Sequence, residues 1–149
     1  MSLRDLFTSK AKKQEDEKKM TFLKYLVYMA ACDGQTTEDE AQMIIHIMSE
    51  RKGMDKQEAL EEIKSLLKNG FQQNLQVPET QEERDELFCF LATEMLMDEK
   101  IEKQEWSFLT LMAKTLYKVD DTTAHNMAVK VCKGLIDTGS FPVTEVNID

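Results

Sequence analysis

Apolar residues recur at spacings of three and four positions in six segments of the chain, which is the pattern of amphipathic α-helices. Thr37, Asp55, Thr80 and Asp120 stand just before four of these segments, where a hydroxyl or a carboxylate can cap a helix. Gly53 is placed to end the second helix in a left-handed turn. The pattern therefore predicts six core helices, beginning near positions 20, 37, 55, 80, 102 and 120.

The apolar faces of these helices define a predicted core. Trp106 is expected to anchor the core from the fifth helix, and Leu66 and Leu67 are expected to face inward from the third. Methionine fills irregular gaps between packed side chains, and five are assigned to the core: Met43, Met48, Met95, Met97 and Met112. The sixth helix carries a continuous apolar stripe made of Ala124, Met127, Ala128, Val131, Cys132, Leu135 and Ile136.

Composition agrees with an all-α fold. Glycine and proline number only 5 and 2, whereas good helix formers such as Glu, Lys, Leu, Met and Ala are abundant. A length of 149 residues suits one domain with a substantial core. The net charge of −9 argues against nucleic acid as a partner, because phosphate contacts need a basic surface.

The cysteines and the hydropathy of the chain indicate a cytoplasmic protein. Cys32, Cys89 and Cys132 are odd in number and far apart, so we expect small buried side chains in a reducing compartment instead of a disulfide framework. The sequence shows no signal-peptide pattern and no apolar run of about 18 residues, so no transmembrane segment is expected.

The two ends of the chain differ from the predicted helical domain over 20–138. Positions 1–19 form a charged N-terminal arm with a small apolar cluster of Leu3, Leu6 and Phe7. Two interpretations of the arm stay open: a short helix or frayed leader on the domain, or a basic amphipathic contact for a partner or membrane surface. Positions 139–149 are expected to be an extended or mobile tail.

An internal repeat appears when the sequence is shifted by 65 positions. Leu26 then falls on Leu91, Asp55 falls on Asp120, and the register holds without a gap through three predicted helices. One three-helix unit buries its apolar stripes poorly, whereas two packed together bury them well. We therefore expect a bundle of about six to seven helices built from a duplicated unit, with halves at about 20–69 and 85–135.

Two acidic turns recur at this interval, over 33–40 and 98–105. Asp33 and Asp98 follow a helix, where a carboxylate opposes the helix dipole, so another group should hold each of them. That group is a cation, the free N–H groups of the next helix or a lysine. Glu40 and Glu105 open the next helix, and Glu94, one helical turn before Asp98, can assist.

Two interpretations of these carboxylates stay open. As a metal site, Asp33, Glu40, Asp98, Glu105 and Glu94 would be oxygen ligands, which favour calcium, magnesium or manganese. As structural residues, the glutamates favour the dipole of the helix they open, and Glu40 completes a capping box with the preceding threonine.

A standard EF-hand is excluded, even though both turns resemble the end of an EF-hand loop. Met29, Ala31 and Leu96 occupy positions where such a loop needs coordinating side chains.

Other candidate residues point to no chemistry. His46 and His125 are not spaced with each other or with cysteine as metal ligands are, so both are expected to be ordinary helix residues. We find no nucleophile motif, no glycine-rich phosphate loop and no CxxC pair in the sequence. A non-enzymatic protein is therefore expected.

At the acidic turns the chain resembles the TerB-like family, the helical domain of tellurite-resistance proteins that also occurs at the start of DjlA-type co-chaperones. The family pattern of an apolar helix ending in Ala-x-Asp-Gly, then polar residues and a Glu, is matched by Ala31-Cys32-Asp33-Gly34 through Glu40. The turn at 98–105 matches it with Glu99 where Gly is usual. The resemblance covers roughly 20–135.

The resemblance implies an all-α, bacterial, non-catalytic domain whose acidic residues bind metal. It also implies a role in stress response and in assemblies near the inner face of the membrane. A co-chaperone role does not transfer, because this chain lacks a J-domain.

Two functions are consistent with the sequence. The first is a cytoplasmic TerB-like module that binds a divalent cation. The second is a metal-free helical module that docks a basic or membrane-associated protein partner. The second interpretation places the protein peripheral to the inner membrane, and a homo-oligomer is compatible with either.

Overall fold

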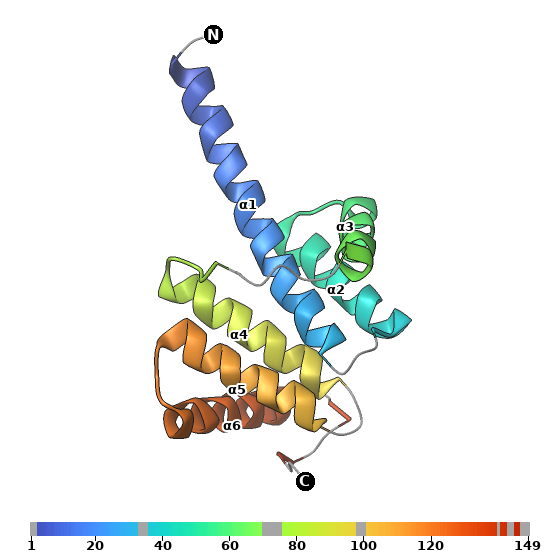
Figure 1. Ribbon diagram of the computed structural model, residues 1–149, viewed down its shortest axis with the longest axis vertical. Coiled ribbons are helices and arrows are strands. Elements are labelled where there is room, and N and C mark those ends of the chain that lie inside the picture. The colour runs from blue at the N-terminus through green and yellow to red at the C-terminus, as the bar shows by residue number, and fades with distance from the viewer. Residues whose placement is uncertain are drawn as a thin grey trace.

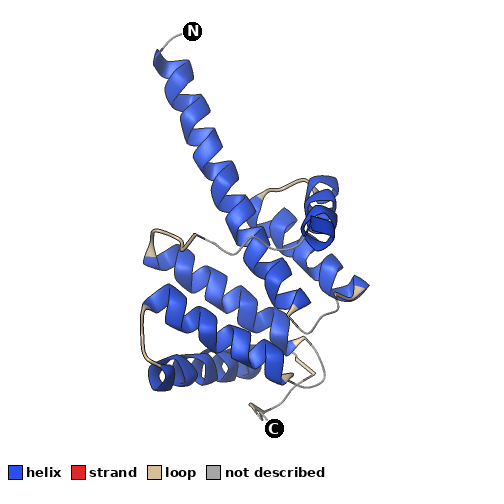
Figure 2. Ribbon diagram, in the orientation of Figure 1, coloured by secondary structure: helices blue, strands red, loops and turns tan. Residues whose placement is uncertain are grey.

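The computed structural model describes residues 3–32, 36–69, 76–97, 101–139, 141–142 and 145–146, with side chains from Glu15 onward. These residues form six helices and no strand (Figures 1 and 2). The expected all-α bundle is confirmed. The helices are α1 (Leu3–Ala31), α2 (Glu38–Lys52), α3 (Lys56–Asn69), α4 (Gln81–Leu96), α5 (Lys103–Tyr117) and α6 (Asp121–Thr138).

The C-terminal half of α1 lies at the centre of the bundle (Figure 1). Helices α2 and α3 pack on one side of it, and α4 and α5 pack on the other, with α6 against α4 and α5. Leu23, Leu26 and Val27 have no exposed surface, because α1 is covered on several sides at once. The core is therefore built outward from this helix.

Helix α1 begins at Leu3, so the prediction of a helix starting near position 20 is wrong. The N-terminal half of α1 projects beyond the other helices (Figure 1). Side chains 15–18 are exposed, whereas Phe22 and Leu23 are buried, so the helix enters the bundle at about position 20.

Lys52 links three helices at the point where α1 enters. Its ammonium lies 4.4 Å from the ring centroid of Phe22 on α1, a cation–π contact. It also forms an ion pair with Glu86 of α4. The last residue of α2 therefore holds α1 and α4 together across the join between the two groups of helices.

Helix starts follow the predicted capping residues. The Oγ1 atom of Thr80 accepts a hydrogen bond from the Glu83 N–H at 3.1 Å. Asp120 accepts one from the Thr123 N–H at 2.8 Å, which holds the pKa of its carboxyl below the ordinary value. Asp55 accepts one from the Glu58 N–H at 3.3 Å.

Helix bounds recur at the 65-residue interval. Helix α2 spans 38–52 and α5 spans 103–117, and α3 and α6 begin at 56 and 121. The residues that follow α2 and α5 also correspond, because both have a left-handed backbone conformation. Gly53 has a φ of 66°, and Lys118 has a φ of 53°. Lysine is sterically strained in this conformation, whereas glycine is not.

The predicted core is largely confirmed, with two errors. Trp106 is buried, as are Met48, Met95 and Met112. The assignment of Leu67 and Met97 to the core is wrong, because their side chains are 44% and 50% exposed. Leu67 lies near the end of α3, and Met97 ends α4, and each points away from the packed interior.

The prediction of buried cysteines is confirmed for Cys132, whereas Cys32 and Cys89 are only partly buried. None of the three is in a disulfide bond. Burial raises the pKa of the Cys132 thiol from 9.0 to about 12. Across the described residues, no helix combines the length and apolar character needed to cross a bilayer.

The two left-handed positions predict opposite responses to substitution. Gly53→Ala should lower the free energy of unfolding by about 1 kcal/mol through backbone strain, since a Cβ there meets no atom within 4 Å. Lys118→Gly should raise it by roughly 0.5 to 1 kcal/mol. Urea unfolding measures both.

Gly134→Ala is the control, because Gly134 lies inside α6, where an added Cβ would meet no atom within 4 Å. It should stabilise the protein by roughly 0.5 to 1 kcal/mol through helix propensity. A Gly53→Ala variant as stable as the parent would contradict the strain argument.

The raised pKa of Cys132 predicts alkaline destabilisation. The native thiol keeps its proton at pH values where the unfolded chain loses it, so stability is complete below pH 9.0 and falls as pH rises toward about 12. The loss is at most about 1.4 kcal/mol per pH unit. Urea unfolding in reductant at about one unit below and one unit above pH 9.0 measures this difference. Cys132→Ala should show a smaller difference, and an equal one would refute the assignment.

Candidate functional site: buried carboxylates at the α4–α5 connection

Two carboxylates lie inside the protein beside the second acidic turn. Glu94 and Glu105 are each 3% exposed, and they are the buried charged residues of the described chain. Both Oε atoms of Glu94 and Oε1 of Glu105 are shielded from solvent. Burial thus distinguishes these two predicted site residues from the acidic residues on the surface.

The connection between α4 and α5 positions this pair. Glu94 lies in the last turn of α4, where its backbone carbonyl accepts a hydrogen bond from the Met97 N–H at 3.3 Å. Glu105 lies in the first turn of α5, and the two helices pack against each other. The two carboxylates therefore flank the turn that contains Asp98.

The two helix termini affect the carboxylates differently. Glu105 lies at the positive end of the α5 dipole, which favours its charge, and the preceding Glu102 makes no side-chain cap. Glu94 lies near the negative end of α4, which disfavours its charge. Burial of a carboxylate costs free energy unless a proton, hydrogen-bond donors or a cation compensates it. The dipole of α4 therefore does not help to offset the burial of the Glu94 carboxylate, whereas the dipole of α5 helps to offset that of Glu105.

The first acidic turn has a different arrangement. Oε1 of Glu40 accepts hydrogen bonds from the Thr37 N–H at 3.2 Å and the Thr37 hydroxyl at 2.9 Å, and the Glu40 N–H donates to Thr37 Oγ1 at 3.1 Å. This is the predicted capping box. Met29, fully buried, stands 65 positions before Glu94. The first turn thus has a methionine where the second has a buried acid.

Asp33 and Asp98, the other two predicted ligands, lie outside the described residues. Of the predicted site residues that are described, Glu94 and Glu105 flank one connection, while Glu40 opens α2. Within the described ranges, no group of three or more His, Cys, Asp or Glu side chains is placed to hold a metal ion. The assignment of metal ligands stays a prediction.

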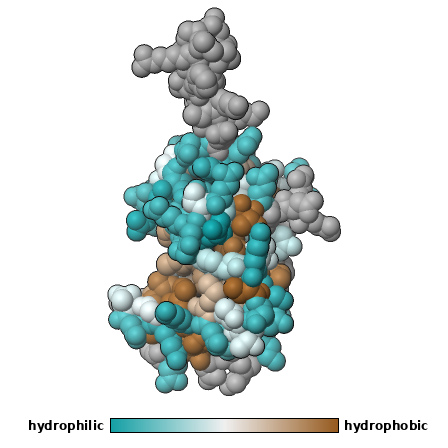
Figure 3. Space-filling model, turned by 90° about the vertical axis from the view of Figure 1, so that its left-hand side faces the viewer, coloured by the Kyte–Doolittle hydropathy of each residue, from teal (hydrophilic) through white to brown (hydrophobic). Residues whose placement is uncertain are grey.

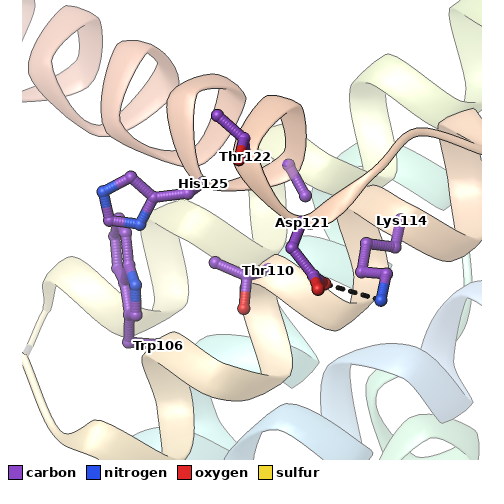
Figure 4. A pocket seen from close by; sticks show the side chains of 7 residues that line it. Trp106, Thr110, Lys114, Asp121, Thr122 and His125 are labelled. Atoms are coloured by element: carbon purple, nitrogen blue, oxygen red, sulfur yellow. Dashed lines mark ion pairs between the residues drawn. The ribbon is translucent and has the colours of Figure 1, made fainter.

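A shallow pocket between α5 and α6 adjoins Glu105 in sequence (Figure 4). Trp106, the next residue, packs edge-to-face on His125, with ring centroids 5.5 Å apart and an interplanar angle of 75°. Lys114 forms an ion pair with Asp121 at 2.6 Å. Figure 4 shows the aromatic pair and the ion pair at opposite ends of a cavity of about 410 Å³. The site therefore has an aromatic wall, and its charged groups compensate each other.

The sequence gives no sign of this pocket. Its patterns assign Trp106 to the core and His125 to an ordinary helix position, whereas their contact joins different helices. No local pattern connects these two positions, because edge-to-face packing depends on how α5 and α6 cross.

Comparison of the chain with protein-family models, with curated proteins and with solved structures finds no match.

Proposed function

We propose that this chain is a non-enzymatic TerB-like helical module that binds a divalent cation, with Glu94 and Glu105 as its principal ligands. The observation that carries the proposal is the burial of both carboxylates beside one acidic turn, each only 3% exposed. A divalent cation bound by both carboxylates would offset the free-energy cost of burying them. Oxygen ligands favour calcium, magnesium or manganese.

Asp98 is proposed as the third ligand, because it lies in the connection that Glu94 and Glu105 flank. In the first half, Asp33 and Glu40 are the proposed counterparts. Glu40 already serves the α2 capping box, and Met29 replaces the buried acid. The proposal therefore assigns the tighter site to the second half.

The proposal compares the two halves as copies of one unit, and several features that recur at an interval of 65 positions support this. They are both bounds of α2 and α5, the starts of α3 and α6, and the left-handed residues that follow α2 and α5. Such recurrence is expected if one three-helix unit was copied. A cytoplasmic, stress-response setting follows from the resemblance to the TerB-like family and is part of the same proposal.

A second candidate function is a metal-free interaction module. The projection of α1 beyond the bundle favours it, because an exposed helix offers a surface for a basic or membrane-associated partner (Figure 1). In that case Glu94 and Glu105 would be purely structural.

Thermal unfolding tests the cation site. After treatment with chelator, calcium, magnesium and manganese are added separately. A cation at about 100 times its dissociation constant should add about 2.7 kcal/mol of stability, which raises the midpoint by several degrees. The fluorescence of Trp106, the single tryptophan, should change over the same titration, because it adjoins Glu105.

Glu94→Met separates a binding role from a structural one, because it copies the residue at the corresponding position of the first half. We expect it to abolish the cation shift, because a methionine thioether does not replace a carboxylate oxygen as a ligand of these hard cations. Glu50→Gln, at an exposed position on α2, should keep the full shift. A Glu94→Met variant that is destabilised equally with and without cation would assign Glu94 a structural role and refute the proposal.

A further inference from the structure

The shallow pocket between α5 and α6 has two ends of different chemistry (Figure 4). At one end the exposed side chain of His125 packs on Trp106, which is itself only 7% exposed. At the other end the Lys114 ammonium lies 2.6 Å from the Asp121 carboxylate, and Thr110 lies between the two ends. A molecule that fills this pocket would therefore contact an aromatic surface and both members of an ion pair.

The ion pair at the second end is open to solvent. Its side chains, Lys114 and Asp121, are 41% and 87% exposed. An exposed ion pair contributes little to stability, so its members can take new partners at small cost. A ligand that brings a carboxylate to the ammonium and an ammonium to the carboxylate keeps every charge paired. An α-amino acid carries these two groups on one carbon atom, so they lie side by side as the two protein charges do.

The aromatic end of the pocket favours a ring on the side chain of such a ligand. Aromatic rings attract one another in edge-to-face and offset-stacked arrangements, with centroids about 4.5 to 7 Å apart. His125 and Trp106 already form one such pair, with centroids 5.5 Å apart, and the imidazole of His125 stays accessible to a third ring. The cavity of about 410 Å³ lies within the range of roughly 300 to 1,000 Å³ that is typical of small-molecule sites.

The chemistry of this pocket is confined to the second half of the chain. In order, the positions 65 residues before Trp106, His125, Lys114 and Asp121 carry Ala41, Leu60, Ser49 and Lys56. Helices α2 and α3 pack against each other without an aromatic pair or an ion pair at these positions. Figure 3 views the molecule from the side that is on the left in Figure 1, and shows hydrophobic surface mainly at the height of α4 to α6. Packing of the two helices therefore does not by itself require these four side chains.

We propose that this pocket binds the zwitterion of a free aromatic amino acid. Lys114 binds its carboxylate, Asp121 binds its ammonium, and His125 and Trp106 contact its ring. An aromatic residue at the end of a peptide or protein carries only one of the two charges, so it would satisfy only half of the ion pair. The pocket does not depend on the cation site at the α4–α5 connection, and binding is expected in chelator.

Titration of the full chain with L-phenylalanine in chelator tests this site. The fluorescence of Trp106, the single tryptophan, should change saturably. Calorimetry should give one site per chain, with a dissociation constant on the order of 0.1 to 1 mM for a ligand this small. N-Acetylphenylalanine and phenylalanine amide each lack one charge and should bind roughly 10-fold more weakly. L-Leucine lacks the ring and should also bind more weakly.

Two variants copy the residues at the corresponding positions of the first half. Lys114→Ser should weaken phenylalanine binding roughly 10-fold through the lost charge, and His125→Leu should weaken it roughly 3-fold through the lost ring. Circular dichroism should match that of the parent, because neither side chain is buried. Lys130→Ser, at an exposed position of α6 outside the pocket, is the matched control and should bind as the parent does.

A parent protein that shows neither a saturable fluorescence change nor binding heat at about ten times the expected dissociation constant overturns the proposal. Equal binding of phenylalanine and leucine would refute the role of the aromatic end, and a Lys114→Ser variant that binds as the parent does would refute that of the ion pair. Tighter binding of N-acetylphenylalanine or of the amide than of phenylalanine would assign the pocket to a chain terminus instead.

Discussion

Burial of the C-terminal half of α1 is the constraint on which the rest of the fold depends. Four helices cover this segment, and Leu23, Leu26 and Val27 have no exposed surface. A hydrogen bond also ties this segment to the chain that leads into α4: the Tyr25 hydroxyl donates to the Gln76 carbonyl at 3.1 Å. Burial raises the pKa of the Tyr25 hydroxyl. Because one helix organises both groups of helices, a core substitution in α1 affects the α2–α3 pair and the α4–α6 group together.

The same helix connects the regions to which we assign functions. Its N-terminal half projects beyond the bundle, and its C-terminal end leads to the first acidic turn. A continuous helix is stiffer than a linker, so the projecting segment keeps a fixed direction relative to the bundle.

The sequence is sufficient for the helices that have clear caps, and insufficient where a property depends on tertiary packing. Thr37, Asp55, Thr80 and Asp120 locate helix starts because capping is a local hydrogen-bond pattern. The start of α1 lacks such a signal, because lysine, glutamate and glutamine are good helix formers and a charged run gives no boundary. The exposure of Met97, the burial of Glu94 and the Trp106–His125 contact all depend on how helices cross, which periodicity does not specify.

The two halves differ at two pairs of corresponding positions, 53 and 118, and 29 and 94. Gly53 takes its left-handed conformation without strain, whereas Lys118 is strained in it. Met29 is apolar in the core, whereas Glu94 is a buried acid at the corresponding position. The strained lysine and the buried acid both lie in the second half: Glu94 is in the last turn of α4, and Lys118 directly follows α5. The second half therefore has a strained lysine and a buried acid where the first half has an unstrained glycine and a methionine, and the buried acid is the residue that the proposed cation site uses.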